Sequence, residues 1–488
     1  MRPNPLTRLL WLAAMCATMA VVCAMSFVSA FNAHPDEKDH VGAGRYYMEY
    51  WDPPKVGDER ARGAYSNYGV SYLNQLDAVY FFAGKFASVV KPLAGKDYLA
   101  LRLFNVCLLG WLMLLFWRLS PPYRVSFLPL FISPQIWYIF SYFNGDALPL
   151  ALSFLAVFLA CRLLEQTDAL SGLSSGTFED VVASHATMMN VTGGSPGSGV
   201  RMGTLVKLGL VLGLLTVSKQ NYYVFLAFFL CFWAVAVSVA RRPALGLRQA
   251  ALVLALLAGV LGLRLGVDAW VVGHQAPDAV YKAAEQLAAE DFKPSKQAEG
   301  KGFWGMNMRA QGLTFQEMFT KWNWHIWTQR TSFGVYGYMK IYAPLLFYRY
   351  ITWMLYALLA AALLPVLLAR PAVPEPGRAS RESGLTVIPT PDALAGPATG
   401  RLYRWALAGM FLLFAALTVA QSFWHSWTAD FQAQGRYFFP ILGMLGSLLA
   451  CFAIPYRRFQ PLVWVVGACM WGMSIWSFVN VGLERIGR

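Results

Sequence analysis

The chain has 488 residues, of which 57% are hydrophobic and only 14% are charged. Soluble domains carry roughly 25% charged residues, so this composition excludes a soluble globular protein. The net charge of +14 comes from basic residues scattered over many loops, which favours contact with anionic lipid over nucleic acid. All seven cysteines lie in apolar runs, which argues against a disulfide framework or a zinc knuckle.

Apolar runs of about 20 residues, the length of a membrane-spanning helix, recur along the chain. The sequence therefore predicts an all-α fold, a polytopic transmembrane helix bundle that occupies residues 1–488 as a single membrane domain. Residues 125–163 would extend roughly 58 Å as one helix, so the chain must fold back at the polar break Asn144-Gly145-Asp146. About 11 spans are predicted, near residues 9–31, 98–118, 124–142, 146–164, 203–218, 221–240, 248–271, 343–369, 403–424, 437–454 and 460–482.

Basic residues in the short loops orient these spans, because cytoplasmic loops are enriched in lysine and arginine. Arg118 and Arg124 fall on one side, and Arg2 and Arg8 place the N-terminus with them in the cytoplasm. Residues 28–30 resemble a signal-peptide cleavage site. The apolar stretch before them exceeds the usual length of about 7–15 residues, which favours a retained anchor.

Four longer loops follow from this orientation. Residues 32–97 and 272–342 are external and are expected to carry surface helices, one of them over 277–292, where apolar residues recur with helical spacing. Residues 165–202 and 371–402 are cytoplasmic and rich in Gly, Ser, Pro and Ala, a composition typical of disorder.

The first external loop opens with His34-Pro35-Asp36-Glu37-Lys38-Asp39-His40. Asp36 and Glu37, two carboxylates at the membrane surface, suit proton abstraction or cation binding. A solvated acidic turn is the alternative. His34 and His40 are the candidate metal ligands, although no histidine spacing in the chain resembles a helical ligand pair.

Asp146 and Lys219 occupy the two polar breaks that face the external side. Asp146 precedes an apolar run, so it is either an interfacial acid or a helix N-cap. The apolar run before Lys219 begins at Leu208 and rises only about 15 Å, so this lysine lies below the membrane surface. A lysine there is costly unless it faces a watery cavity or an anion, and snorkelling to the headgroups is the alternative.

Arg436 lies at the start of the tenth predicted span. An arginine at a helix start opposes the helix dipole, but it is useful if a phosphate is held there by the exposed N–H groups. Contact with a lipid phosphate is the alternative. Arg264 and Asp268, four residues apart in the seventh span, are interpreted as a structural ion pair.

The predicted topology places Asp36, Asp146, Lys219 and Arg436 on the same membrane face although they come from four separate segments. Acids and cations at one interface would suit a donor whose phosphate is held while a hydroxyl is deprotonated. Five neighbours are candidate substrate-binding residues, namely His40, Gln220, Asn221, Gln434 and Tyr437.

Two patterns resemble known membrane enzymes, over roughly residues 9–454. The Pro-Asp-Glu-x-x-His pattern at residues 35–40 resembles the glycosyltransferase C (GT-C) superfamily. The segments 434–440 (QGRYFFP) and 331–338 (TSFGVYGY) resemble, more specifically, the bacterial DUF2142 membrane family.

This resemblance implies transfer of a sugar from a polyprenyl-phosphate donor to a glycan or lipid acceptor, on the external face of the inner (plasma) membrane of a bacterium. The catalytic base or metal ligand in the first external loop matches Asp36, with Glu37 beside it, and a second acidic site matches Asp146. Lys219 and Arg436 would bind the lipid phosphate. The resemblance allows a divalent cation, Mg²⁺ or Mn²⁺, as cofactor.

The expected mechanism is a displacement at the anomeric carbon in which Asp36 deprotonates the acceptor hydroxyl. Trp322, Trp324 and Trp327 would form an interfacial lid, with an aromatic belt as the alternative. A lipid or glycan transporter or flippase is the rival function, because Ser133-Pro134-Gln135 introduces a kink in the third span. A third hypothesis is a non-catalytic membrane assembly factor for the cell envelope.

Overall fold

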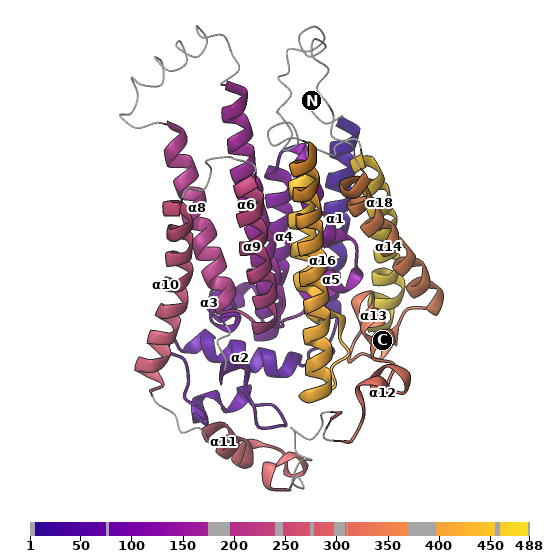
Figure 1. Cartoon of the computed structure of the whole chain (residues 1–488). Helices are drawn as coiled ribbons and strands as arrows, with labels where there is room; N and C mark the ends of the chain where they lie inside the picture. Colours follow the sequence, from indigo (N-terminus) through magenta and orange to yellow (C-terminus); the bar gives the residue numbers. More distant parts are fainter. Residues whose placement is uncertain are drawn as a thin grey trace, which may run out of the picture.

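The structure, a computed structural model, is a bundle of long helices with a layer of shorter helices at one end (Figure 1). We call this end the loop face; it carries α2 (Glu37–Glu49), α11 (Ala279–Leu287), α12 (Phe315–Thr320) and α13 (Trp324–Ser332). The helix α1 (Pro5–Val28) begins at the opposite end, and α18 (Gln460–Ser477) ends toward the loop face. The residues described are 5–74, 78–173, 196–239, 247–273, 278–296, 308–309, 311–368, 397–453 and 459–486.

Within these residues, eight helical segments are long and apolar enough to cross a membrane, and two shorter apolar helices accompany them. The chain is therefore a multi-pass membrane protein, and the predicted all-α bundle is confirmed. The eight segments are built on α1 (Pro5–Val28), α4 (Asp97–Arg118), α6 (Ala147–Leu173), α10 (Leu247–Val271), α14 (Leu345–Leu368), α16 (Pro397–Thr428), α17 (Phe439–Phe452) and α18 (Gln460–Ser477). The two shorter helices are α8 (Pro196–Thr216) and α9 (Tyr223–Val239).

The predicted span 124–142 is not one helix. It consists of the 3₁₀ helix η3 (Pro121–Phe131) and the short helix α5 (Pro134–Ser141). Proline cannot donate a backbone hydrogen bond, so Pro129 and Pro134 disfavour a continuous α-helix. Ser133 caps the N-terminus of α5 by accepting a hydrogen bond from the backbone of Gln135 at 3.1 Å.

Both loops that were predicted to be long and structured carry helices. Residues 32–97 contain α2 (Glu37–Glu49), η1 (Glu59–Ala64), η2 (Tyr72–Asn74) and α3 (Val79–Ala94). Residues 272–342 contain α11 (Ala279–Leu287), η5 (Glu290–Phe292), η6 (Pro294–Lys296), α12 (Phe315–Thr320), α13 (Trp324–Ser332) and a hairpin of β1 (Val335–Tyr336) and β2 (Ile341–Tyr342). The surface helix predicted over 277–292 is thus shorter than expected, and it packs with Ala283 and Ala284 inward.

The other two predicted loops are only partly described. α6 continues to Leu173 and α8 begins at Pro196, so helices occupy both ends of the predicted disordered loop 165–202. α16 begins at Pro397, inside the predicted loop 371–402. The remaining parts of both loops, 174–195 and 371–396, lie outside the described residues.

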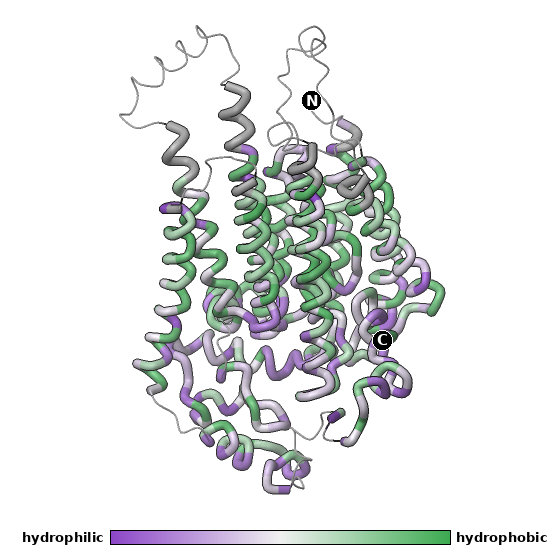
Figure 2. The backbone as a smooth tube through the Cα atoms, viewed as in Figure 1, coloured by the Kyte–Doolittle hydropathy of each residue, from purple (hydrophilic) through white to green (hydrophobic). Residues whose placement is uncertain are grey.

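Hydrophobic residues dominate the long helices, whereas hydrophilic residues gather at the loop face (Figure 2). The main core lies between α1, α4, α5, α6 and α17, where Trp137, Phe140 and Phe143 are fully buried. Many apolar side chains on the outside of the bundle stay exposed, as Leu263 and Trp270 of α10 do. This distribution is what a bilayer around the helices would favour.

Candidate functional site

The four charged residues that the sequence placed on one face form a chain of ion pairs at the loop face. A guanidinium nitrogen of Arg436 lies 3.3 Å from a carboxylate oxygen of Asp36, and another lies 3.7 Å from Asp146. Lys219 Nζ donates a 2.7 Å hydrogen bond to the other oxygen of Asp146. The predicted convergence of these four residues, which we call the charge cluster, is confirmed.

Asp146 is the buried centre of the charge cluster, with a side chain that is 1% exposed. Its expected role as a helix N-cap belongs to Asn144, whose side-chain oxygen accepts hydrogen bonds from the backbone of Asp146 and Ala147 at 2.9 and 3.2 Å. The Asp146 carboxylate is therefore free to bind cations. A buried carboxylate needs such partners, since an unpaired charge in a low dielectric is costly.

Lys219 and Arg436 approach Asp146 from two different helix junctions. α8 ends at Thr216, and Lys219 follows in extended backbone before η4 (Gln220–Tyr222), with its side chain 25% exposed. Arg436 lies in the 3₁₀ turn η8 (Gly435–Phe438) just before α17, and its side chain is 11% exposed. Both cations thus sit at the bundle end rather than in its apolar middle, and snorkelling does not account for their shared contact with Asp146.

Gly435 fixes the position of Arg436 by packing directly on α13. Its backbone N–H donates to Thr331 Oγ1 at 2.8 Å, and a Cβ added at Gly435 would overlap the backbone N and Cα of Ser332. We predict that Gly435→Ala lowers the stability by about 1–3 kcal/mol, because backbone must move to relieve the overlap. Thermal unfolding of the detergent-solubilised protein measures this effect.

Gly409→Ala is the matched control for that substitution. Gly409 lies within α16, and a Cβ there would meet no atom within 4 Å among the described residues. This variant should unfold at the wild-type temperature or slightly above it, because alanine is a better helix former than glycine. Equal unfolding temperatures for the two variants would contradict the tight contact between Gly435 and α13.

Asp36 is presented to Arg436 by an unusual backbone conformation. Its φ of +57° lies in the left-handed region, which costs about 1 kcal/mol or more for a residue other than glycine. Its carbonyl accepts hydrogen bonds from Asp39 and His40 at 3.1 and 3.0 Å, while its carboxylate makes no capping hydrogen bond. The Asp36 side chain is 42% exposed, so it is the carboxylate of the charge cluster that solvent or a ligand can reach.

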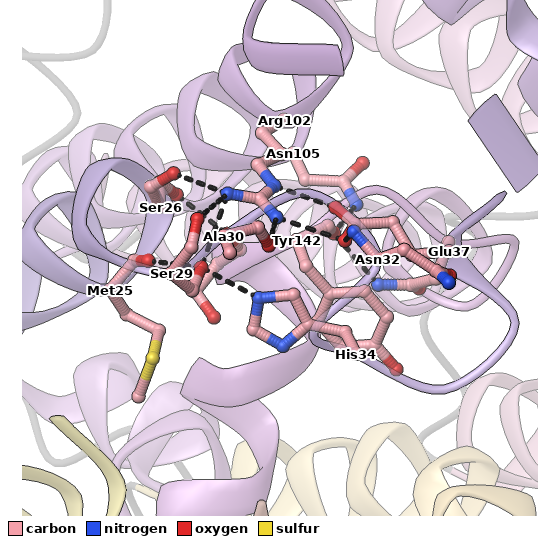
Figure 3. Close-up of polar contacts among 12 residues, drawn as sticks. Met25, Ser26, Ser29, Ala30, Asn32, His34, Glu37, Arg102, Asn105 and Tyr142 are labelled. Atoms are coloured by element: carbon pink, nitrogen blue, oxygen red, sulfur yellow. Dashed lines mark hydrogen bonds and ion pairs between the residues drawn. The ribbon is translucent and has the colours of Figure 1, made fainter. Parts of the chain in front are cut away.

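The residues on both sides of Asp36 are locked into the bundle (Figure 3). His34 is fully buried, stacks on Tyr142, and bonds Tyr138 and Ser29 through its two ring nitrogens at 2.7 and 2.8 Å. Glu37 is fully buried and receives hydrogen bonds of 2.6 and 2.9 Å from Arg102. These flanking anchors hold the strained residue between them in place.

Arg102 ties the end of α1 to the start of α2. Besides Glu37, its guanidinium donates to the carbonyls of Ser26, Ser29 and Ala30 at 2.7–2.9 Å, as Figure 3 shows. A cation at the C-terminal end of one helix and an acid in the first turn of the next both match the helix dipoles. Arg102 was not among the predicted site residues, although a charge inside the predicted apolar span 98–118 is a signal that could have identified it.

Glu37 does not belong with the predicted catalytic residues. Both of its carboxylate oxygens are bound, one to Arg102 and the other to Arg102 and the backbone N–H of Asn32. Burial raises its pKa, and Arg102 acts in the opposite direction. We assign Glu37 a positioning role, because no lone carboxylate oxygen faces the charge cluster.

His34 and His40 are not placed to bind a metal. Both nitrogens of His34 are engaged, and Nδ1 of His40 bonds the Tyr80 hydroxyl at 2.5 Å. Within the described ranges there is no group of three or more His, Cys, Asp or Glu residues that could hold a metal ion. The carboxylates of Asp36 and Asp146 instead share Arg436, so these residues do not fit a divalent cation.

His40 nevertheless faces the charge cluster. It is 2% exposed and stacks on Tyr72 with ring centroids 4.3 Å apart. Its Nε2 is buried without a hydrogen-bond partner in the described chain. Burial is the largest cause of its lowered pKa, followed by the positive charges of Lys219 and Arg436. His40 is therefore neutral at pH 7 and offers one unused ring nitrogen to a ligand.

The protein should lose stability as the pH falls below about 6.5, the ordinary histidine pKa. Burial lowers the pKa of both His34 and His40, so both stay neutral in the folded protein while the unfolded chain takes up protons. Each histidine contributes a loss of up to about 1.4 kcal/mol per pH unit in this range. Thermal unfolding between pH 7.5 and 5.5 measures the slope.

The double variant His34→Gln with His40→Gln is the control for that slope. Glu37 has a raised pKa and acts in the opposite direction, because its folded form binds a proton more readily than the unfolded chain. Glu37 is present in both proteins, so the difference between their slopes isolates the histidines. Identical slopes would show that the buried histidines are not the cause.

The remaining predicted substrate-binding residues lie around the same site. Both polar atoms of the Asn221 side chain are buried without a partner in the described chain, whereas Gln220 is exposed. The Arg436 guanidinium lies over the ring of Tyr437, 5.6 Å from its centroid. Gln434 lines a pocket, together with Arg436.

Three tryptophans were predicted to form an interfacial lid. Of these, Trp324 is buried, whereas Trp322 and Trp327 are exposed.

The pocket that Gln434 lines lies beside the charge cluster, is small and is partly open to solvent. It is lined by Pro35 next to Asp36, by α5, by the segment from α13 to the β-hairpin, and by residues 434–436. The contribution of α5 to this pocket was not predicted, because the sequence indicated only a kink at Ser133-Pro134-Gln135 in that span. Chemically, the site combines an accessible carboxylate, two cations and an adjacent cavity.

Comparison of the chain with protein-family models, with curated proteins and with solved structures finds no match in any of the three.

Proposed function

We propose that this protein is a membrane glycosyltransferase that moves a sugar from a polyprenyl-phosphate donor to a glycan or lipid acceptor of the cell envelope. The observation that supports this proposal most strongly is the charge cluster beside a pocket. Asp36 supplies an accessible base, while Lys219 and Arg436 supply positive charge for a phosphate.

The proposed reaction is a displacement at the anomeric carbon of the donor sugar. The acceptor hydroxyl gives its proton to the Asp36 carboxylate, and its oxygen forms a bond to the anomeric carbon. The bond between that carbon and the phosphate oxygen breaks, and polyprenyl phosphate leaves with the electron pair. Lys219 and Arg436 stabilise the charge on the departing phosphate.

Donor binding would also release the base. Asp36 and Arg436 pair at 3.3 Å, the more exposed contact of the cluster, whereas Asp146 lies between both cations. A phosphate that binds Arg436 would compete with Asp36 and not with the buried Asp146–Lys219 pair. Asp36 is then free to accept a proton only when a donor is present.

We place the loop face on the external side of the inner (plasma) membrane of a bacterium, with the N-terminus in the cytoplasm. Arg118 ends α4 at the end of the bundle opposite to Asp97, and Arg124 follows in η3. Positive charge at short loops is typical of the cytoplasmic side. Polyprenyl-linked sugars would then reach the site from the outer leaflet.

The test is transfer by the purified protein in liposomes that contain a polyprenyl-phosphate sugar and an envelope-glycan extract. We expect the amount of released polyprenyl phosphate to match the amount of sugar that is incorporated. The glycan profile of a strain that lacks the gene identifies the sugar. Intact donor after incubation, together with an unchanged glycan profile, would refute the proposal.

The broken crossing at Ser133 favours a second candidate, a lipid or glycan transporter. The Ser133 hydroxyl donates a hydrogen bond to the carbonyl of Ser332 at 2.6 Å, which places the break beside α13 at the loop face. The same liposomes distinguish the two functions. A transporter moves the lipid-linked sugar between leaflets without changing it chemically, whereas a transferase consumes it.

A further inference from the structure

The pocket beside the charge cluster contains hydrogen-bonding groups that the protein itself does not use. Within the described chain, the side chain of Gln434 and the hydroxyl of Tyr142 make no hydrogen bond, and the buried Nε of Arg436 has no partner. Gln135 uses only its side-chain oxygen, which accepts from the backbone of Val335 at 3.2 Å. Four lining residues thus retain free donors or acceptors.

Three structural features hold these groups around one space. The break before α5 turns Gln135 toward Val335, because Ser133 caps the helix and also bonds α13. The Tyr138 hydroxyl accepts from the backbone of Gly337 at 2.8 Å, which joins α5 to the β-hairpin. The tight contact of Gly435 with Ser332 fixes the segment that carries Gln434 and Arg436. The lining is therefore built before any ligand arrives.

The chemistry of the lining fits a polyhydroxylated ring. Amide side chains offer both donors and acceptors, as sugar hydroxyl groups require, and tyrosine adds a flat apolar surface with a polar tip. Arg436 at the edge of the pocket adds a positive charge for a phosphate. The pocket is small and partly open to solvent, so it suits one ring that extends partly outside it rather than an oligosaccharide.

We infer that this pocket binds the sugar ring of a glycosyl phosphate, with the phosphate at Arg436 and the ring hydroxyls at Gln135, Gln434 and Tyr142. The inference rests on the proposed function, since it assigns the donor sugar to one side of Arg436. The acceptor would then approach from the exposed side of Asp36. Gln135 and Gln434 select which sugar is transferred.

Binding can be measured without any transfer step. The full-length protein in detergent is titrated with glucose, galactose and mannose 1-phosphates, with the three free hexoses, and with inorganic phosphate, and its unfolding temperature is followed. At least one hexose 1-phosphate should stabilise the protein at a concentration about tenfold or more below that of inorganic phosphate. Such a difference corresponds to the gain of one or two hydrogen bonds.

Variants assign the effect to the pocket. Gln434→Ala, which removes a side chain with no hydrogen bond to lose, should abolish the advantage of the sugar phosphate while the response to inorganic phosphate remains. Gln135→Ala should do the same, and Arg436→Ala should remove both responses. Gln316→Ala is the matched control, because Gln316 is an exposed glutamine on α12 outside the pocket.

Two outcomes would overturn the inference. One is that none of the hexose 1-phosphates binds better than inorganic phosphate, and the other is that Gln434→Ala binds them as the wild type does. If sugar is transferred in the liposome assay but either outcome is observed, the proposed function stands and the assignment of this pocket fails. If a hexose 1-phosphate binds selectively but no sugar is transferred, the pocket assignment stands and the proposed function fails.

Discussion

Asp36→Asn should lower the rate of sugar transfer by about 10²- to 10⁴-fold, the usual contribution of a general base. Asparagine has nearly the same shape and can occupy the same left-handed backbone conformation, in which Asp36 has a φ of +57°. It cannot accept the proton of the acceptor hydroxyl. Initial rates of polyprenyl phosphate release, measured at equal amounts of inserted protein, give the ratio.

The matched control is Asp39→Asn, one turn along α2. It removes the same charge from the same helix, and no ion pair of Asp39 occurs among the described residues. This variant should transfer sugar within a few-fold of the wild-type rate. If Asp36→Asn retains the wild-type rate while remaining folded, the Asp36 carboxylate is not the base.

Arg102→Ala should destabilise the protein by about 3–5 kcal/mol, the usual result of removing one partner of a buried ion pair. Both members are buried, with side chains 1% and 0% exposed, so Glu37 would remain as an unpaired charge in an apolar environment. The carbonyls at the end of α1 would also lose their donor. SDS-induced unfolding in mixed micelles measures the loss.

The double variant Arg102→Met with Glu37→Leu separates the ion pair from simple packing. Replacing both charges with apolar groups of similar volume is often neutral, so most of the lost stability should return. Transfer should stay reduced, because Asp36 would no longer be anchored through its neighbour. If the single variant Arg102→Ala is as stable as the wild type, the ion pair does not hold α1 and α2 together.

The membrane topology of the charge cluster could be predicted because it depends only on chain direction. Asp36, Asp146, Lys219 and Arg436 each lie at a turn between apolar runs, and every second turn reaches the same end of the bundle. Their contacts at 2.7–3.7 Å follow once the helices pack. The exact pairing did not follow, since a sequence does not show which cation reaches which carboxylate.

Glu37 was misjudged because its role is set by a residue 65 positions away. Beside Asp36 it looks like a second surface carboxylate, but the start of α2 turns it toward Arg102 in α4. Likewise, the sequence around Gln135 and Tyr142 indicated only a kink at Ser133-Pro134-Gln135 and no pocket. They line the pocket only because two prolines break the third crossing and α13 fills the gap.

Native mass spectrometry of the purified protein with a polyprenyl-phosphate sugar tests most directly whether the charge cluster binds the donor. Wild type and Asp36→Asn should retain one donor molecule per chain, the latter without turnover, whereas Arg436→Ala combined with Lys219→Met should retain none. Equal retention of the donor by that double variant and by the wild type would contradict phosphate binding at Lys219 and Arg436.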